Sequence, residues 1–155
     1  MTADQAAPAD VHVREAVRQG RRAADRLDAV RQCGGVLVEI GAVEAPYVEA
    51  MVEREGSIST YVGEGIAIPH GTDESRRFVR RTALAVLTFP DGVDWGGGRV
   101  FGCVAIAASG SEHVALLASL ADVLMDSAQA ERLRTATDVD DVLTLLTPHA
   151  EENDS

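Results

Sequence analysis

Two nearly continuous apolar runs, residues 82–89 and 100–107, constrain the fold of this chain more than any other feature. Each run is typical of a strand that is buried on both faces of a sheet. Pro90-Asp91-Gly92 and Gly96-Gly97-Gly98 lie between the runs and supply turn residues. A sheet that is buried on both faces needs cover on both sides, so helices must reach each face.

Two amphipathic helices are predicted before these strands. Apolar residues recur at helical spacing over residues 22–40, where Gly34-Gly35 weakens the helix and Gly41 ends it. A second helix starts at Pro46 and ends near Gly56, because proline suits a first helical turn. Its apolar residues are Val48, Met51 and Val52.

Shorter elements complete the pattern. Residues 58–68 form a loop that leads into a short strand, and Thr72 caps a short helix that reaches residue 79. The capping-box spacing of Ser109-Gly110-Ser111-Glu112 opens a longer helix. We also expect short helices at 127–135 and 139–146, and either an edge strand or a helix at 11–17.

This interleaving of helices and strands predicts an α/β fold, a layered single domain with a central mixed β-sheet flanked by helices. A length of 155 residues fits one domain. The domain is expected over 11–149, between a flexible N-terminal tail at 1–10 and an acidic C-terminal tail at 150–155. No leader and no apolar run near the roughly 20 residues of a membrane span are evident, so we expect a cytoplasmic protein without membrane insertion.

The charge balance narrows the classes of partner. The chain has 25 acidic residues against 14 basic residues, all of them arginine, and a net charge of −11. Such a field disfavours nucleic acid and anionic membranes, and it favours a partner with a basic face. Cys33 and Cys103 show no metal-ligand or redox spacing, so both are expected to be buried, reduced thiols.

Of the four histidines, His70 has the most unusual neighbours. Pro69 and Gly71 flank it, which places it at a strand end where backbone and side chain are expected to be accessible. A neutral imidazole there can act as a nucleophile when its other nitrogen is held by a hydrogen bond. On the residues alone, a histidine that merely fills a turn is an equal alternative. His12 and His149 lie near the chain ends, where solvent exposure explains them.

The sequence also contains a second histidine and several arginines that could bind an anion beside His70. His113 falls in the first turns of the helix that Ser109 opens, where free amides and the helix dipole favour an anion and a neutral ring. Arg54 lies in the last turn of the second helix, and Arg76 and Arg77 offer further planar donors. A solvated surface charge is the alternative for any single arginine.

Other chemistries have weaker support. His70 and His113 with nearby carboxylates are a possible metal site, but they lack the close spacing of a zinc motif. The chain has no nucleophile elbow, no P-loop and no dinucleotide fingerprint. We therefore predict neither a cofactor nor a metal, and any phosphate handled here does not come from bound ATP.

Two motifs in order resemble one family, the enzyme IIA component of the bacterial phosphoenolpyruvate-dependent sugar phosphotransferase system, in its mannitol and fructose class. The first is Glu53-Arg54-Glu55 followed by Ser59-Thr60-Tyr61-Val62-Gly63-Glu64-Gly65-Ile66-Ala67-Ile68-Pro69-His70-Gly71-Thr72. The second is Asp91-Gly92-Val93-Asp94-Trp95-Gly96, then residues 104–108, then Glu112-His113-Val114 with Leu117 and Leu120. The resemblance runs from about residue 24 to residue 146.

The resemblance implies a phosphotransferase component with a phosphohistidine intermediate. His70 would accept a phosphoryl group at Nε2 from the phosphocarrier protein HPr and pass it to a cysteine of a IIB domain. By the same matching, His113 would be the second active-site histidine and Arg54 the arginine beside the phosphoryl group. Glu64 stands where the family commonly has Asn.

The resemblance leaves two hypotheses for the role of the protein, and it does not identify the transported compound. Thr60-Tyr61 resembles the mannitol subclass, so uptake of a mannitol-like polyol or a sugar is the first hypothesis. The alternative is a regulatory protein of the nitrogen-related type, in which phosphorylation of His70 switches binding to a transporter or a transcription factor.

Overall fold

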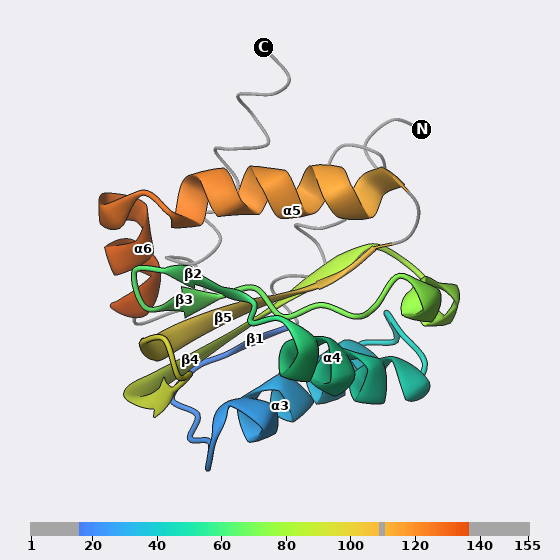
Figure 1. Cartoon of the computed structure of the whole chain (residues 1–155), viewed down its shortest axis with the longest axis horizontal. Coiled ribbons are helices and arrows are strands. Elements are labelled where there is room, and N and C mark those ends of the chain that lie inside the picture. Colours follow the sequence, from blue (N-terminus) through green and yellow to red (C-terminus); the bar gives the residue numbers. More distant parts are fainter. Residues whose placement is uncertain (1–15, 109–110, 137–155) are drawn as a thin grey trace.

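The computed structural model describes residues 16–108 and 111–136, with the backbone alone over 111–117. Its centre is one five-stranded sheet with the order β1-β4-β5-β3-β2. Helices cover both faces of this sheet (Figure 1), so the predicted layered α/β fold is confirmed. The strands are β1 (Val17–Arg18), β2 (Tyr61–Gly63), β3 (Ile66–Ala67), β4 (Ala83–Asp94) and β5 (Arg99–Ala107).

The sheet is mixed, as predicted. β1 runs parallel to β4 at one edge, and β4 pairs antiparallel with β5 over most of its length. β3 runs parallel to β5, with Ala67 opposite Cys103, and β2 pairs antiparallel with β3 at the other edge. The parallel pairing of β3 and β5 matters for function, because it brings the segments that follow these two strands to the same end of the sheet.

Two helical layers enclose the sheet (Figure 1). α3 (Arg26–Glu39) and α4 (Pro46–Ser57) cover one face, and α5 (Ser111–Leu124) and α6 (Ser127–Arg134) lie over the other. A short 3₁₀ helix, η1 (Glu74–Phe78), follows β3 and contacts α4. Along β4, Ala83, Ala85 and Leu87 join the core beneath α3 and α4, whereas Leu84 and Val86 join the core beneath α5 and α6.

The first helix begins later than its apolar pattern predicted. α3 starts at Arg26 because the carboxylate of Asp25 accepts a hydrogen bond from the amide of Asp28 at 2.9 Å, which caps the helix. Ala24, an apolar residue within the predicted range 22–40, lies before this cap and is exposed. The predicted stop is confirmed, since Gly41 has a φ of +78° just after the helix.

The turn between the two long strands is shorter than expected. Pro90-Asp91-Gly92 does not end β4, which shifts register between Thr88 and Val93 and pairs with β5 again through Asp94. The reversal is made at Trp95 and Gly98, where the Trp95 amide donates to the Gly98 carbonyl at 2.9 Å. The strand continues because a bulge absorbs the extra residues and Val93 returns to the core.

Several predictions concern residues outside those described. These are both tails, the ends of the proposed domain, the helix at 139–146, the cap at Ser109-Gly110, and the positions of His12 and His149. The helix predicted at 127–135 is confirmed as α6. Within the described residues, no helix is both long and apolar enough to cross a membrane.

Candidate functional site

His70 lies three residues beyond β3, in a segment that is hydrogen-bonded on two sides. The amide of Ile106 on β5 donates to the Pro69 carbonyl at 2.9 Å, and the amide of Ile68 donates to the Thr60 carbonyl at 3.0 Å. These backbone hydrogen bonds, one with Thr60 and one with β5, therefore fix the position of His70. β2 and β3 are short, but β5 and Thr60 supply hydrogen-bond partners for the backbone of this segment and hold it in place.

One hydrogen bond sets the tautomer of the His70 ring. Nδ1 lies 2.8 Å from the carbonyl oxygen of Ile68. A carbonyl can only accept, so Nδ1 carries the proton, and in the neutral ring the lone pair is on Nε2. The expectation that one ring nitrogen orients the other is thereby confirmed.

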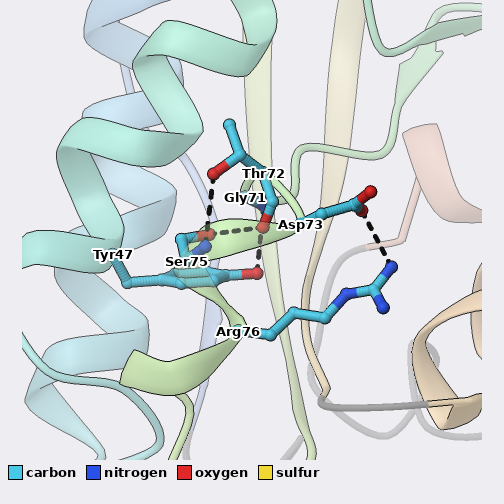
Figure 2. Close-up of polar contacts among 6 residues, drawn as sticks. All are labelled: Tyr47, Gly71, Thr72, Asp73, Ser75 and Arg76. Atoms are coloured by element: carbon cyan, nitrogen blue, oxygen red, sulfur yellow. Dashed lines mark hydrogen bonds and ion pairs between the residues drawn. The ribbon is translucent and has the colours of Figure 1, made fainter.

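The expectation that the His70 side chain is accessible is wrong. His70 is 6% exposed, because the chain beyond β3 folds back against α4 instead of projecting into solvent. The amide of Gly71 donates to the Tyr47 hydroxyl at 3.0 Å, and that hydroxyl donates to the Ile106 carbonyl at 2.9 Å. In Figure 2 the Tyr47 hydroxyl points toward Gly71, and Ser75 lies beside the Tyr47 ring.

Gly71 is required for this close approach. A Cβ at residue 71 would lie 2.4 Å from Ser75 Oγ and 2.6 Å from Tyr47 Cε1, which is closer than atoms can pack. Ser75 is itself fixed, since its hydroxyl donates to the Thr72 carbonyl at 2.7 Å (Figure 2). The amide of Gly71 thus donates to Tyr47, whereas the sequence predicted an accessible backbone at this position.

The surroundings of His70 lower its pKa from the ordinary value of 6.5. Burial is the main cause, and the positive charges of Arg54 and Arg76 act in the same direction. The hydrogen bond to Ile68 and the negative charge of Glu55 oppose them. The ring is consequently neutral near pH 7, which is the form that can act as a nucleophile.

The structure brings Arg54 and Arg76 to the His70 site. Arg54, in the last turn of α4, donates to the Ile58 carbonyl at 2.9 Å, and its charge acts on the His70 ring. Arg76 on η1 forms an ion pair with Asp73 at 3.0 Å (Figure 2), and its charge also acts on that ring. Arg77 points elsewhere, because its guanidinium stacks over the Phe78 ring at 4.9 Å.

His113 is the third residue of α5, the helix that follows β5. Since β3 and β5 are parallel, the start of α5 and the His70 segment leave the sheet at the same end. The side chain of His113 is outside the described residues, so its part in the site stays a prediction.

The sequence analysis missed Glu55 as a member of the site. This side chain is 2% exposed and accepts three hydrogen bonds, from Thr60 N at 3.1 Å, Thr60 Oγ1 at 2.5 Å and Trp95 Nε1 at 2.8 Å. The buried residues of α4 are Tyr47, Met51 and Glu55, whereas Val48 and Val52 are only partly buried. The signal was the spacing of four residues from Tyr47 to Met51 and from Met51 to Glu55, which places the carboxylate on the buried face of α4, where an acid needs internal donors.

Glu64 adopts an unusual backbone conformation. Its φ of +56° lies in the left-handed region, which Asn adopts more readily than Glu. The Glu64 carbonyl accepts a hydrogen bond from Arg134, and its carboxylate accepts one from Ser127 Oγ at 3.2 Å. Both contacts join the β2–β3 hairpin to α6, and the bond from Ser127 is the one that uses the glutamate side chain.

Two further predictions concern metals and thiols. No group of three His, Cys, Asp or Glu side chains that could hold a metal occurs among the described residues. Cys33 and Cys103 are buried free thiols, as predicted. The hydrogen bond between Cys103 and Cys33, together with burial, raises the pKa of Cys103 well above its ordinary value.

The sequence matches the model of the family described as "Phosphoenolpyruvate-dependent sugar phosphotransferase system, EIIA 2" over residues 13–148. The chain belongs to this EIIA family. It is 36% identical over 126 residues to the mannitol-specific phosphotransferase enzyme IIA component of Geobacillus stearothermophilus, covering 81% of this chain and 87% of that protein.

A longer relative and a solved complex are also similar to this EIIA chain. The multiphosphoryl transfer protein of Escherichia coli O157:H7 is 44% identical over 84% of the chain, and the chain spans about a third of that protein (35%). The enzyme IIA of the E. coli mannitol system, solved in complex with phosphorylated enzyme IIB, superposes with a TM-score of 0.79 at 38% identity. That match covers 86% of this chain and 95% of the solved chain.

Proposed function

We propose that this EIIA protein accepts a phosphoryl group on His70 Nε2 from phospho-HPr and transfers it to a cysteine of a IIB partner. The observation that carries the proposal is the 2.8 Å bond between His70 Nδ1 and the Ile68 carbonyl, since it leaves the lone pair on Nε2. The protein would act in the cytoplasm in the uptake of a sugar or polyol. The mannitol-specific relative supports a mannitol-like cargo, and the solved E. coli complex supports IIB as a partner.

The surroundings of His70 suit phosphoryl transfer without a metal. Such transfer needs in-line positioning and neutralisation of charge that spreads over the phosphoryl oxygens. Arg54 and Arg76 supply two guanidinium groups close enough to act on the ring, and His113 would donate a further hydrogen bond. The low exposure of His70 would limit hydrolysis of the phosphorylated ring by water.

The charge of the chain suits the proposed partners. A net charge of −11 would draw in a protein whose binding face carries a basic rim and would speed their encounter. Because this attraction is screened by salt, transfer from HPr should slow as ionic strength rises.

The test is phosphorylation with phosphoenolpyruvate, enzyme I and HPr, followed by addition of IIB. We expect acid-labile phosphate on the wild-type protein and on a His12→Gln control, and none on His70→Gln. Equal labelling of His70→Gln would refute the proposal. Loss of the label to IIB would support transport, whereas retention on His70 in the presence of IIB would favour the regulatory alternative.

A further inference from the structure

A buried carboxylate is linked to the His70 ring by consecutive hydrogen bonds. Glu55 Oε2 accepts from the Thr60 amide at 3.1 Å, and the Thr60 carbonyl accepts from the Ile68 amide at 3.0 Å. The Ile68 carbonyl in turn accepts from His70 Nδ1 at 2.8 Å. In each of the three bonds the donor lies on the His70 side and the acceptor on the Glu55 side, and the bonds are joined through the Cα atoms of Thr60 and Ile68.

The hydrogen bonds around Glu55 suit a carboxylate that accepts on both of its oxygens. Both of its oxygens accept hydrogen bonds, and the 2.5 Å bond from Thr60 Oγ1 has the length typical of a hydroxyl bound to an ionised carboxylate. Trp95 Nε1, which can only donate, contributes the third bond at 2.8 Å. At 2% exposure, water hardly screens this negative charge from neighbouring groups.

We infer that Glu55 is a positioning residue of the phosphoryl site, which acts on His70 through Thr60 and Ile68. The inference rests on the proposed role of His70 as phosphoryl acceptor. It assigns a function to a glutamate that was not among the predicted site residues His70, His113 and Arg54.

The transfer step creates the charge on which Glu55 would act. As the bond between Nε2 and phosphorus forms, the bond between phosphorus and its donor breaks, and that electron pair leaves with the donor. The Nδ1 proton stays on the ring, so the imidazole becomes formally cationic. The Ile68 carbonyl that accepts from Nδ1 and the negative charge of Glu55 both stabilise that cation, and the Nδ1 bond also keeps Nε2 in the attacking orientation.

The charged groups that face His70 come from several elements. Arg54 and Glu55 lie on α4, and Arg76 lies on η1, while the His113 side chain on α5 is outside the described residues. Both arginines oppose a positive ring, and Glu55 favours one. Among the described residues, Glu55 is the acidic group whose charge acts on the His70 ring, whereas Asp73 offsets Arg76 through their ion pair.

A purely structural role for Glu55 is the competing explanation, because its bonds join α4 to Thr60 and to the turn at Trp95. Glu55→Gln separates the two roles. The glutamine oxygen can accept from the Thr60 amide and Trp95 Nε1, and its NH₂ group can donate to Thr60 Oγ1, so the contacts are kept and only the charge is lost. Glu53→Gln is the matched control, since Glu53 is exposed on the same helix.

The first measurement is the pKa of His70, followed by NMR in the unphosphorylated proteins. We expect Glu55→Gln to lower it below the wild-type value and Glu53→Gln to leave it unchanged. The second measurement is the rate of labelling by phospho-HPr, which we expect to fall about tenfold in Glu55→Gln alone. An unchanged pKa, or an unchanged rate, in a folded Glu55→Gln protein would overturn the inference.

A measurement on the wild-type protein covers the case in which Glu55→Gln does not fold. Trp95 is the single tryptophan of the chain, so its indole N–H signal is assigned without ambiguity, and this N–H donates directly to Glu55 Oε2. That signal should shift when His70 of the wild-type protein is phosphorylated, because the ring becomes cationic and the charge of Glu55 acts on it. An unchanged Trp95 signal on phosphorylation would overturn the inference. Wild-type protein that takes no label would refute the proposed function, while the His70 titration still decides whether Glu55 acts on the ring.

Discussion

The hydroxyl of Tyr47 on α4 lies 3.0 Å from the amide nitrogen of Gly71, the residue that follows His70. The same hydroxyl donates to the Ile106 carbonyl of β5 at 2.9 Å, so one phenol joins a helix, the His70 segment and the sheet. Burial raises the pKa of Tyr47 above its ordinary value, which keeps this donor protonated. The position of His70 therefore depends on a side chain 23 residues earlier in the sequence.

Tyr47→Phe should destabilise the protein and slow labelling of His70. Phenylalanine keeps the ring packing but leaves the Gly71 amide and the Ile106 carbonyl without this partner, at a cost of about 1–3 kcal/mol. Urea denaturation measures the loss. Tyr61→Phe, which removes a hydroxyl outside this network, is the control. An unchanged urea midpoint for Tyr47→Phe would show that the hydroxyl contributes nothing.

Arg76→Gln should raise the pKa of His70, because it removes a positive charge that opposes protonation of the ring. It should also slow phosphoryl acceptance if Arg76 neutralises the transferred group. Arg77→Gln is a matched control, since Arg77 is adjacent on η1 but stacks on Phe78. NMR titration of both variants provides the comparison, and equal His70 pKa values in the two would count against a role for Arg76.

Labelling of His70 should depend on pH in a direction set by its lowered pKa. The rate should hold as pH falls through 6.5 and decline only below the lowered value, when Nε2 becomes protonated. Stability should change in the same sense. Because the unfolded chain binds this proton more readily, the stability contribution is present above about 6.5 and is lost as pH falls through the folded pKa. His70→Gln should lack that component, and denaturation of both proteins across this range provides the measurement.

The two adjacent glycines of α3 should respond oppositely to alanine. Gly35 is exposed and a Cβ there meets nothing within 4 Å, so Gly35→Ala should stabilise the helix by about 0.5–1 kcal/mol. A Cβ at Gly34 would lie 3.0 Å from Val48 and 3.1 Å from Met51 Sδ, so Gly34→Ala should force α3 and α4 apart and destabilise the protein. Thermal melting distinguishes them, and two equal shifts would contradict the packing described.

Features that depend on neighbouring residues could be predicted from the sequence. The apolar runs predicted β4 and β5, and Gly41 and Pro46 marked helix ends, because local patterning reports which faces must be buried. The bulge at Pro90-Asp91-Gly92 was missed, since whether a strand resumes after a turn signal depends on its partner strand. Likewise, α3 begins at Arg26 and not at residue 22, because the Asp25 side chain caps the helix, and the apolar pattern does not show this hydrogen bond.

By itself, the sequence determined a layered α/β chain with a histidine between proline and glycine, and its motifs pointed to Arg54 and His113 as companions of His70. Only the tertiary structure decided that His70 is buried, that its Nδ1 carries the proton, and that Glu55 is connected to the ring through Thr60 and Ile68. These features arise where β3 meets β5 and α4 meets the His70 segment. Contacts between residues far apart in the chain set burial and hydrogen-bond direction, which no local pattern encodes.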